Sequence, residues 1–389
     1  MKKNYLFLLL ICLLVACHQS GPSGIDITSL EKISIDEKES TEKADATFLI
    51  DTTFARMVLL ELNSECLIGE VTSLYYKNNK IIVFDKQTHS VYIFNEDGSY
   101  YSKIHAVGQG PGEYSQRVDF VLATDSTIAV LCPVIKKILY YNYEGKHLYD
   151  INLYGAYGNA FYTFDNKIFH LIAGWGSMSE GRYGYFCVDA EKGIIDKQIP
   201  FTSSQDRIGQ GWLLYNIVFC GEDRTLAIRS TLDIIWEITP DNVFEPCYYI
   251  DILSNKMPRE IAEGNVEGAL ASGFSLGVTR VMEHGKYLFL IMRDYNTVIY
   301  DKEKKNAVSL SKYYEIPEWD FHVRFNDDVS FQDKYILFEE PMDISDLNLV
   351  IEYVKTLPDS RIKTKYLNAL MKIEDDEMNP LICILKFKE

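Results

Sequence analysis

The sequence predicts an all-β fold: a six-bladed β-propeller with four-stranded blades, an N-terminal strand that closes the last blade, and small helical insertions. One plan of apolar strands, polar breaks and an acidic turn recurs in three stretches, Ile81 to Ile104, Ile128 to Leu153 and Lys167 to Phe201. Their turns end in Gly98, Gly145 and Gly193, which lie 47 and 48 residues apart. This period in an all-strand chain is typical of propeller blades, because a four-stranded sheet buries both faces only between neighbouring sheets. The many aromatic residues, 27 Tyr and 20 Phe, also suit half-buried strands.

The first residues have the pattern of a bacterial export signal. Two lysines precede an apolar run from Tyr5 to Val15, which is too short to span a bilayer but suits the core of a signal peptide. The run ends in Leu14-Val15-Ala16-Cys17, which resembles the lipobox of bacterial lipoproteins. This resemblance implies that residues 1–16 are removed and that Cys17 carries a lipid anchor. The alternative is ordinary signal cleavage nearby, which leaves a soluble exported protein.

Residues 17–46 are polar and charged, so we expect a flexible tether between the membrane and the folded body. His18 to Gly24 carry no acidic cluster of the kind found in some surface-directed lipoproteins. We therefore expect an outer-membrane lipoprotein that faces the periplasm rather than the cell surface. The formal net charge of −17 repels phosphate backbones, which argues against a nucleic-acid partner. The simpler interpretation of this charge is the solubility of an exported surface.

Strand patterns place the first five blades at about residues 71–105, 119–153, 160–201, 213–253 and 276–311. Between the fourth and fifth, Ser254 to Gly273 begins with Pro258-Arg259-Glu260 and has an Ala-rich middle, which suggests a short helix.

Blade six contains a helical insertion at about residues 343–374. After the strands Val323 to Val329 and Lys334 to Phe338, apolar residues repeat at helical intervals, and Asp343 and Ser360 stand at N-cap positions. One more strand, Leu381 to Phe387, leaves the blade one strand short. The apolar strand Met57 to Leu62 can fill that place, so the propeller would span residues 47–389 without exposed sheet edges.

The cysteines beyond residue 17 suggest buried free thiols. An even number in an exported chain permits disulfides, but most of them lie inside apolar strand segments, where cysteine behaves as a small hydrophobic residue. No CxxC pair is present, which argues against a zinc or redox motif. The six are Cys66, Cys132, Cys187, Cys220, Cys247 and Cys383.

A family resemblance rests on two motifs. Residues Gly108-Gln109-Gly110-Pro111-Gly112-Glu113-Tyr114 look like the GxGPGE signature of lipoprotein six-bladed propellers, and Asn379 to Phe387 is similar to their last strand. The resemblance implies a cell-envelope propeller of Gram-negative gut anaerobes, distantly related to NHL and TolB-type propellers. It carries over no activity and no catalytic residue.

Strand order indicates where a ligand would bind. In a blade with strands a to d from inside to outside, the b–c loops and d–a connections leave on one face, and nearly all long segments fall there, whereas the glycine turns are expected on the opposite face. Binding sites concentrate in loops on a rigid scaffold. The alternative is that aspartates and arginines at strand ends form hydrogen bonds between blades. The ligand-binding candidates are Asp85, His89, Glu113, Arg117, Trp175, Arg182, Trp212, Arg229, Arg293, Asp294, His322 and Arg324.

The Gly-Pro-Gly loop has two interpretations. Its N–H groups or Glu113 could touch a ligand near the channel mouth. Alternatively, the loop fixes the crossing from blade one to blade two, with Tyr114 as a packing anchor. The spacing of a phosphate-binding loop is missing.

The favoured function is a non-catalytic, membrane-tethered module that binds a glycan, a peptide or an envelope protein. The seven histidines form no HxxxH or HxH pair and no GxSxG elbow occurs, so no catalytic residue, metal ligand or cofactor is predicted. The alternative is a propeller hydrolase or NHL-type lyase with a metal site assembled from several blades.

Overall fold

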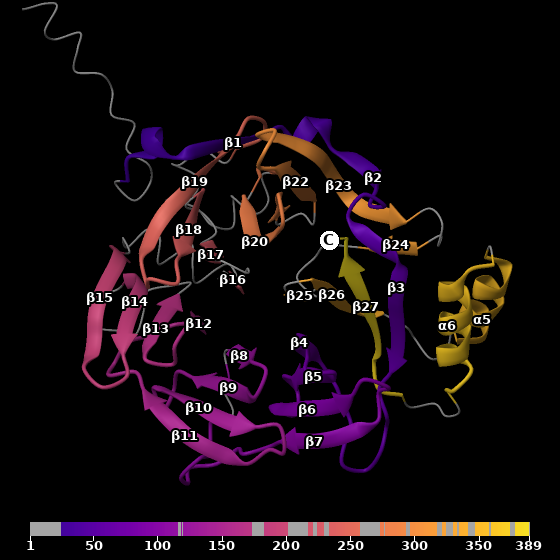
Figure 1. Cartoon of the computed structure of the whole chain (residues 1–389), viewed down its shortest axis with the longest axis horizontal. Coiled ribbons are helices and arrows are strands. Elements are labelled where there is room, and N and C mark those ends of the chain that lie inside the picture. Colours follow the sequence, from indigo (N-terminus) through magenta and orange to yellow (C-terminus); the bar gives the residue numbers. More distant parts are fainter. Residues whose placement is uncertain are drawn as a thin grey trace, which may run out of the picture.

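The computed structural model forms a ring of six sheets around a central axis, seen along that axis in Figure 1. Four antiparallel strands from consecutive chain segments make each of the first five blades, which confirms the predicted six-bladed propeller. The structure describes residues 25–115, 118, 120–172, 183–200, 217–220, 224–228, 233–256, 273–275, 277–292, 296–316, 321–323, 330–332, 334–340, 347–357, 359–373 and 378–388. The predicted signal peptide, Cys17, the core of the segment 254–273 and Asp343 lie outside these residues.

Blades one to three follow the predicted order from the inner to the outer strand. Blade one contains β4 (Val71–Lys77), β5 (Lys80–Asp85), β6 (Ser90–Asn95) and β7 (Tyr100–Ile104). Blade two contains β8 (Phe120–Ala123), β9 (Thr127–Cys132), β10 (Lys137–Asn142) and β11 (His147–Asn152). Blade three contains β12 (Ala160–Tyr162), β13 (Ile168–Ile172), β14 (Tyr183–Asp189) and β15 (Gly193–Pro200).

Blades four and five have additional strands at their outer edges. Blade four contains β16 (Ile217–Cys220), β17 (Thr225–Ile228), β18 (Ile234–Ile238) and β19 (Phe244–Ile252). Blade five contains β20 (Val278–His284), β21 (Tyr287–Met292), β22 (Thr297–Asp301) and β23 (Asn306–Ile316), and β24 (Phe321–Val323) also pairs with β23.

Blade six is closed by the N-terminal part of the chain. It contains β25 (Ser330–Gln332), β26 (Tyr335–Glu340) and β27 (Leu381–Phe387), and its outer strand is β3 (Ile50–Leu59), antiparallel to β27. The sequence located this strand but placed its start too late, at Met57. The first half of β3 includes Asp51, Thr52 and Thr53, which are polar because an outer strand exposes one face to solvent.

The predicted flexible tether is wrong for residues 31–45. Strand β1 (Glu31–Ile35) pairs in parallel with β19, and β2 (Thr41–Asp45) pairs in parallel with β23. Short 3-10 turns, η1 (Ile27–Ser29) and η2 (Glu37–Glu39), flank β1. The polar composition misled the prediction, because main-chain hydrogen bonds to an open sheet edge need few apolar side chains. Only Ile33 and Ile35 anchor this segment in the core, at 0% and 1% exposure.

The hydrophobic core lies between blades rather than within them. Each of six buried clusters joins residues from two adjacent blades, as when Ile82 and Ile93 of blade one pack with Val121 and Val130 of blade two. Burying such a side chain stabilises the fold by about 1.5–3 kcal/mol. The ring therefore depends on every blade having both neighbours.

Helices α5 (Leu347–Thr356) and α6 (Arg361–Leu370) lie outside the ring beside β3 (Figure 1). Val354 and Leu370 face a small cluster with Leu381 of β27. Ser360 is the N-cap of α6, as predicted, and its side chain accepts a hydrogen bond from the Lys363 N–H at 3.0 Å. Among the described residues, no helix is both long enough and apolar enough to cross a bilayer.

The five cysteines whose side chains are described are free thiols, as predicted: Cys66, Cys132, Cys187, Cys247 and Cys383. Burial raises the pKa of the Cys66 and Cys247 thiols to about 12, so both stay protonated and unreactive at neutral pH. Cys220 lies in β16, and its side chain is outside the described part.

Candidate functional site

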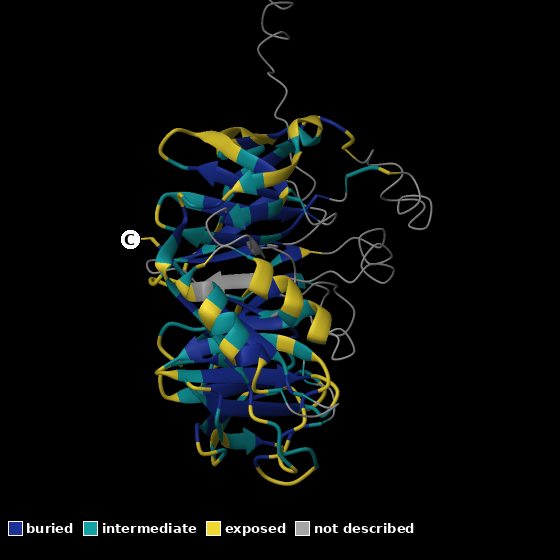
Figure 2. Ribbon diagram, turned by 90° about the vertical axis from the view of Figure 1, so that its right-hand side faces the viewer, coloured by how far each residue is buried: buried dark blue, intermediate teal, exposed yellow. Residues whose placement is uncertain are grey.

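The two faces of the ring carry different connections. We call the face with the a–b hairpins, such as 78–79 and 124–126, the turn face. The opposite face, with the b–c loops such as 86–89 and the d–a connections such as 60–70 and 153–159, is the loop face. Figure 2 shows the ring edge-on, with buried strands inside it and exposed residues in the connections. The longer described connections leave from the loop face, so this face remains the first place to look for a ligand.

The glycine turns between the c and d strands do not simply project from the turn face. The outer strands run around the ring (Figure 1), so each turn lies against the preceding blade. A Cβ added to Gly98 would lie 2.2 Å from the Leu59 carbonyl oxygen, and one added to Gly145 would lie 2.6 Å from that of Lys103. The repeated glycine thus permits close approach between the backbones of adjacent blades.

Most of the predicted ligand-binding side chains lie outside the described part of the structure. His322 is in β24, but only its backbone is described. The others outside it are Arg117, Trp175, Arg182, Trp212, Arg229, Arg293, Asp294 and Arg324.

Asp85 is fully buried at the end of β5, and both oxygens of its carboxylate accept hydrogen bonds from other groups of the protein. One oxygen accepts hydrogen bonds from the N–H groups of Glu70 at 2.8 Å and Gln87 at 3.0 Å. The other accepts one from the Thr88 hydroxyl at 2.6 Å. Asp85 therefore ties the chain entering β4 to the b–c loop of the same blade, a structural role within one blade rather than between blades.

His89 contributes through its backbone. It has a positive φ of 53°, which is uncommon for a residue with a side chain, and its carbonyl oxygen accepts a hydrogen bond from the Tyr114 hydroxyl at 2.7 Å. This bond joins the b–c loop of blade one to the Gly-Pro-Gly loop.

The Gly-Pro-Gly loop is closed by its own hydrogen bonds. The Gly108 N–H donates to the Tyr114 carbonyl at 2.9 Å, and the Tyr114 N–H donates to the Ala106 carbonyl at 2.8 Å. The Glu113 carboxylate accepts a bond from the Gly110 N–H at 2.7 Å. This carboxylate therefore holds its own loop in shape.

The same loop packs against β10 in the outer half of blade two. Tyr114 is 1% exposed, and its ring meets that of Tyr141 edge-on at 6.3 Å between centroids. The Tyr141 hydroxyl donates to the Gly112 carbonyl at 2.8 Å. Burial raises the pKa of Tyr114 to about 12, so its hydroxyl stays a donor throughout the physiological range. These contacts support the interpretation that the loop fixes the crossing between the two blades.

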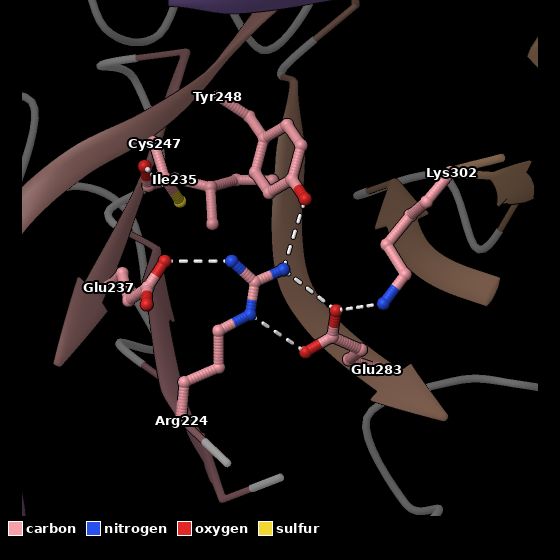
Figure 3. Close-up of polar contacts among 7 residues, drawn as sticks. All are labelled: Arg224, Ile235, Glu237, Cys247, Tyr248, Glu283 and Lys302. Carbon is pink, nitrogen blue, oxygen red and sulfur yellow. Dashed lines mark hydrogen bonds and ion pairs between the residues drawn. The ribbon is translucent and has the colours of Figure 1, made fainter. Parts of the chain in front are cut away.

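A charged cluster that the sequence analysis missed joins blades four and five (Figure 3). Arg224, just before β17, donates from Nε and Nη2 to the two carboxylate oxygens of Glu283 in β20, at 3.0 and 2.7 Å. Its Nη1 donates to Glu237 of β18 at 2.7 Å, and Nη2 also donates to the Tyr248 hydroxyl at 3.0 Å. Lys302 donates to Glu283 as well.

The electrostatics of this cluster favour its charged form. Burial alone would raise the pKa of Glu283, but the bonds donated by Arg224 and Lys302 hold it below its ordinary value. Burial also disfavours the guanidinium charge, yet the bonds to Glu283 and Tyr248 raise the pKa of Arg224. The side chains of Arg224 and Glu283 are only 22% and 11% exposed. The cluster therefore acts as an ionic tie between two blades.

A buried histidine links blades three and four. His170 of β13 is 0% exposed, and its Nδ1 lies 2.7 Å from the Tyr185 hydroxyl. Its Nε2 lies 2.9 Å from Oδ1 of Asn242, in the turn before β19. Burial lowers the pKa of His170, so the imidazole is held neutral. Among the described residues, no group of three or more His, Cys, Asp or Glu is placed to hold a metal ion.

With this geometry established, comparisons with known proteins identify the family. A family described as "Domain of unknown function (DUF4934)" matches residues 32–386. The chain belongs to this family. The matched range begins within β1 and ends within β27, so the DUF4934 family includes the outer N-terminal strands as well as the ring. No curated protein matches the sequence.

One solved structure has a fold similar to that of the DUF4934 chain. A crystal structure of a protein from Bacteroides fragilis NCTC 9343, described as an exported protein, is 18% identical, with a TM-score of 0.67. The alignment covers 92% of this chain and all of the other, which supports the fold alone. The computationally designed Ika8 protein (9% identity, 70% and 68% coverage, TM-score 0.38) and U3-55K (12%, 73% and 77%, 0.42) are too dissimilar to inform interpretation.

Proposed function

We propose that this DUF4934 protein is a non-catalytic binding or scaffold module of the bacterial cell envelope, anchored by a lipid on Cys17. Its loop face would bind a glycan, a peptide or an envelope protein. The observation that carries this proposal is the way the roots of the loop-face connections are fixed. The polar groups of Asp85, His89 and the Gly-Pro-Gly loop form hydrogen bonds that hold those connections in place. A rigid closed ring with fixed loop roots is a platform for binding by the loops it carries.

The envelope location rests on the N-terminal pattern. The basic start, the short apolar run and the small residues before Cys17 together support export and lipidation. The relative from Bacteroides fragilis, described as exported, agrees with this location. We also infer kinship with the lipoprotein propellers that carry the GxGPGE loop and, more distantly, with NHL and TolB-type propellers. An outer-membrane protein that faces the periplasm remains the proposed placement.

Anchoring is tested by expressing the full chain and its Cys17→Ser variant in a Gram-negative host and separating membrane from soluble fractions. The wild type is expected in the membrane fraction with a labelled fatty acid attached, because two or more acyl chains anchor stably. The variant should lose the label. A wild-type protein that carries no label would refute lipidation, and the proposal of loop-face binding would stand independently of that result.

Loop-face binding is tested with a lipid-free protein that begins at residue 18. Candidate glycans, peptides and envelope extracts are screened by equilibrium binding, and each ligand found is measured again with Trp175→Ala, Trp212→Ala and Arg293→Ala. We expect at least one substitution to weaken binding about tenfold, as loss of an aromatic or Arg anchor commonly does. Unchanged binding in all three variants would reject this assignment of the face.

A further inference from the structure

Two cavities on the turn face lie beside each other where blades six, one and two meet. The inner cavity, about 220 Å³, is lined by the a–b hairpin of blade one together with Asp125 of blade two and Lys334 and Tyr335 of blade six. The outer cavity, about 510 Å³, lies between the same hairpin, Arg56 of β3 and the turn 95–97. Asn79 lines both cavities, so they are neighbours, and we call the two together the groove.

Two aromatic side chains, Tyr76 and Tyr335, line the inner cavity. Their rings meet edge-on at 5.1 Å between centroids. The Phe54 ring lies 5.7 Å from Tyr335 but lines neither cavity. The Arg56 guanidinium lies over the Phe54 ring, 5.3 Å from its centroid, and forms an ion pair with Glu96. Tyr76 and Tyr335 offer apolar contact to a ring in the inner cavity, whereas the outer cavity is lined by polar side chains.

The walls are polar and carry no net charge. Three cationic side chains, from Arg56, Lys77 and Lys334, are balanced by three carboxylates, from Glu96, Asp97 and Asp125. A balanced wall gives no long-range attraction to an anion or a cation, so it favours a neutral ligand. Carboxylates accept hydrogen bonds, ammonium groups donate them and amides do both, which suits hydroxyl groups that need one partner of each kind.

Asn79 is the central polar group. It forms a two-residue hairpin loop with Asn78, and both have positive φ values, 51° for Asn78 and 56° for Asn79, as a type I′ turn requires. Its Oδ1 accepts a weak bond from the Tyr76 hydroxyl at 3.4 Å. Within the described part of the chain, its amide nitrogen makes no hydrogen bond, so two donors remain for a ligand.

We propose that this groove binds a neutral oligosaccharide, with one sugar ring in the inner cavity and the next in the outer cavity. The sugar ring in the inner cavity presents an apolar face to Tyr76 and Tyr335 and hydroxyl groups to the mixed walls, and the next ring meets the polar side chains of the outer cavity. A charged polymer would be repelled by half of the charged groups. The site lies on the face opposite the proposed loop-face site, so it goes beyond the proposed function. Because the groove is open to solvent, we expect weak binding, with a Kd of about 1 mM.

The test is saturation-transfer NMR on the lipid-free protein, with maltotetraose, cellotetraose, xylotetraose and, as the charged comparison, tetragalacturonate. Asn79→Gly is the informative variant. It removes the amide but creates Asn-Gly, the preferred type I′ sequence, so the hairpin should fold at least as well. Asn306→Ala, at the exposed first residue of β23 in blade five, is the control.

The proposal predicts saturation transfer to at least one neutral tetrasaccharide. Asn79→Gly should weaken that binding about tenfold, because two hydrogen bonds are lost at about 0.7 kcal/mol each. Asn306→Ala and the loop-face variant Trp175→Ala should bind as the wild type does. Absence of transfer to all three neutral sugars, stronger transfer to tetragalacturonate, or equal binding by Asn79→Gly would each overturn the proposal. A loss of binding in Trp175→Ala alone would instead assign the sugar to the loop face.

Discussion

The junction between blades one and two and the junction between blades four and five perform the same task with different chemistry. The first uses neutral hydrogen bonds, in which the Tyr114 and Tyr141 hydroxyls donate to backbone carbonyl oxygens. The second uses charge, with Arg224 between Glu237 and Glu283. Both supplement apolar clusters that span the same two blades. The contrast teaches that the repeat specifies the blade, whereas the polar contacts between blades are particular to each junction.

The largest expected effect comes from breaking the ionic junction. Glu283→Ala leaves Arg224 largely buried with one carboxylate partner fewer, so we expect the free energy of unfolding to fall by about 2–3 kcal/mol. Urea unfolding of the lipid-free protein measures this change. Glu303→Ala is the control, because its carboxylate is 71% exposed and lies 3.5 Å from Lys286, and its cost should stay below about 0.5 kcal/mol. Equal losses of unfolding free energy in the two variants would show that Glu283 contributes no more to stability than a surface carboxylate does.

The junction between blades three and four extends the comparison to a buried neutral histidine. His170→Leu removes a hydrogen-bond partner from the Tyr185 hydroxyl and from Asn242, so we expect the free energy of unfolding to fall by about 2 kcal/mol at pH 7.5.

This junction should also respond to pH. Burial lowers the pKa of His170 in the folded state, so below pH 6.5, its ordinary value, the unfolded chain binds more protons than the folded one. The stability that neutral His170 supports is therefore complete above pH 6.5 and is lost as pH falls below it. In urea unfolding, the difference in unfolding free energy between wild type and His170→Leu should become smaller as the pH is lowered from 7.5 to 5.5. A constant difference would show that His170 titrates alike in both states.

The neutral junction should give a smaller effect. Tyr114→Phe keeps the buried ring but removes the hydroxyl bonds to the carbonyls of His89 at 2.7 Å and Ile104 at 3.3 Å, so we expect a loss of about 1 kcal/mol in unfolding free energy. Tyr101→Phe provides the control, because its hydroxyl bonds to Glu144 at the surface. A loss at Tyr101 as large as that at Tyr114 would contradict a special role for the junction.

The smallest expected effect is a difference in salt dependence between the ionic junction and the neutral junction. Raising the salt concentration from 0.1 M to 1 M screens charges, so the cost of Glu283→Ala should fall by a few tenths of a kcal/mol, whereas that of Tyr114→Phe should not change. The same urea experiment at both salt concentrations measures this. Equal salt dependence in the two variants would mean that the junctions do not differ in kind.

The sequence predicted the architecture well, because strand periodicity and the spacing of Gly98, Gly145 and Gly193 are local signals. It missed strands β1 and β2, since an outer strand held by main-chain bonds needs few apolar side chains. It also missed the Arg224 cluster, whose five members come from five separate strands or turns and meet only when blades four and five pack together. The Gly-Pro-Gly loop was predictable because its closing contacts lie within the nine consecutive residues from Ala106 to Tyr114.

Polar side chains between blades add to the apolar clusters in holding the ring together, which leaves the faces free to bind. A double-mutant cycle of Arg224→Ala and Glu283→Ala, measured by urea unfolding, tests this claim most directly, because it isolates the coupling across blades four and five. We predict a coupling free energy of at least about 1.5 kcal/mol. Additive costs, within about 0.3 kcal/mol, would contradict the claim.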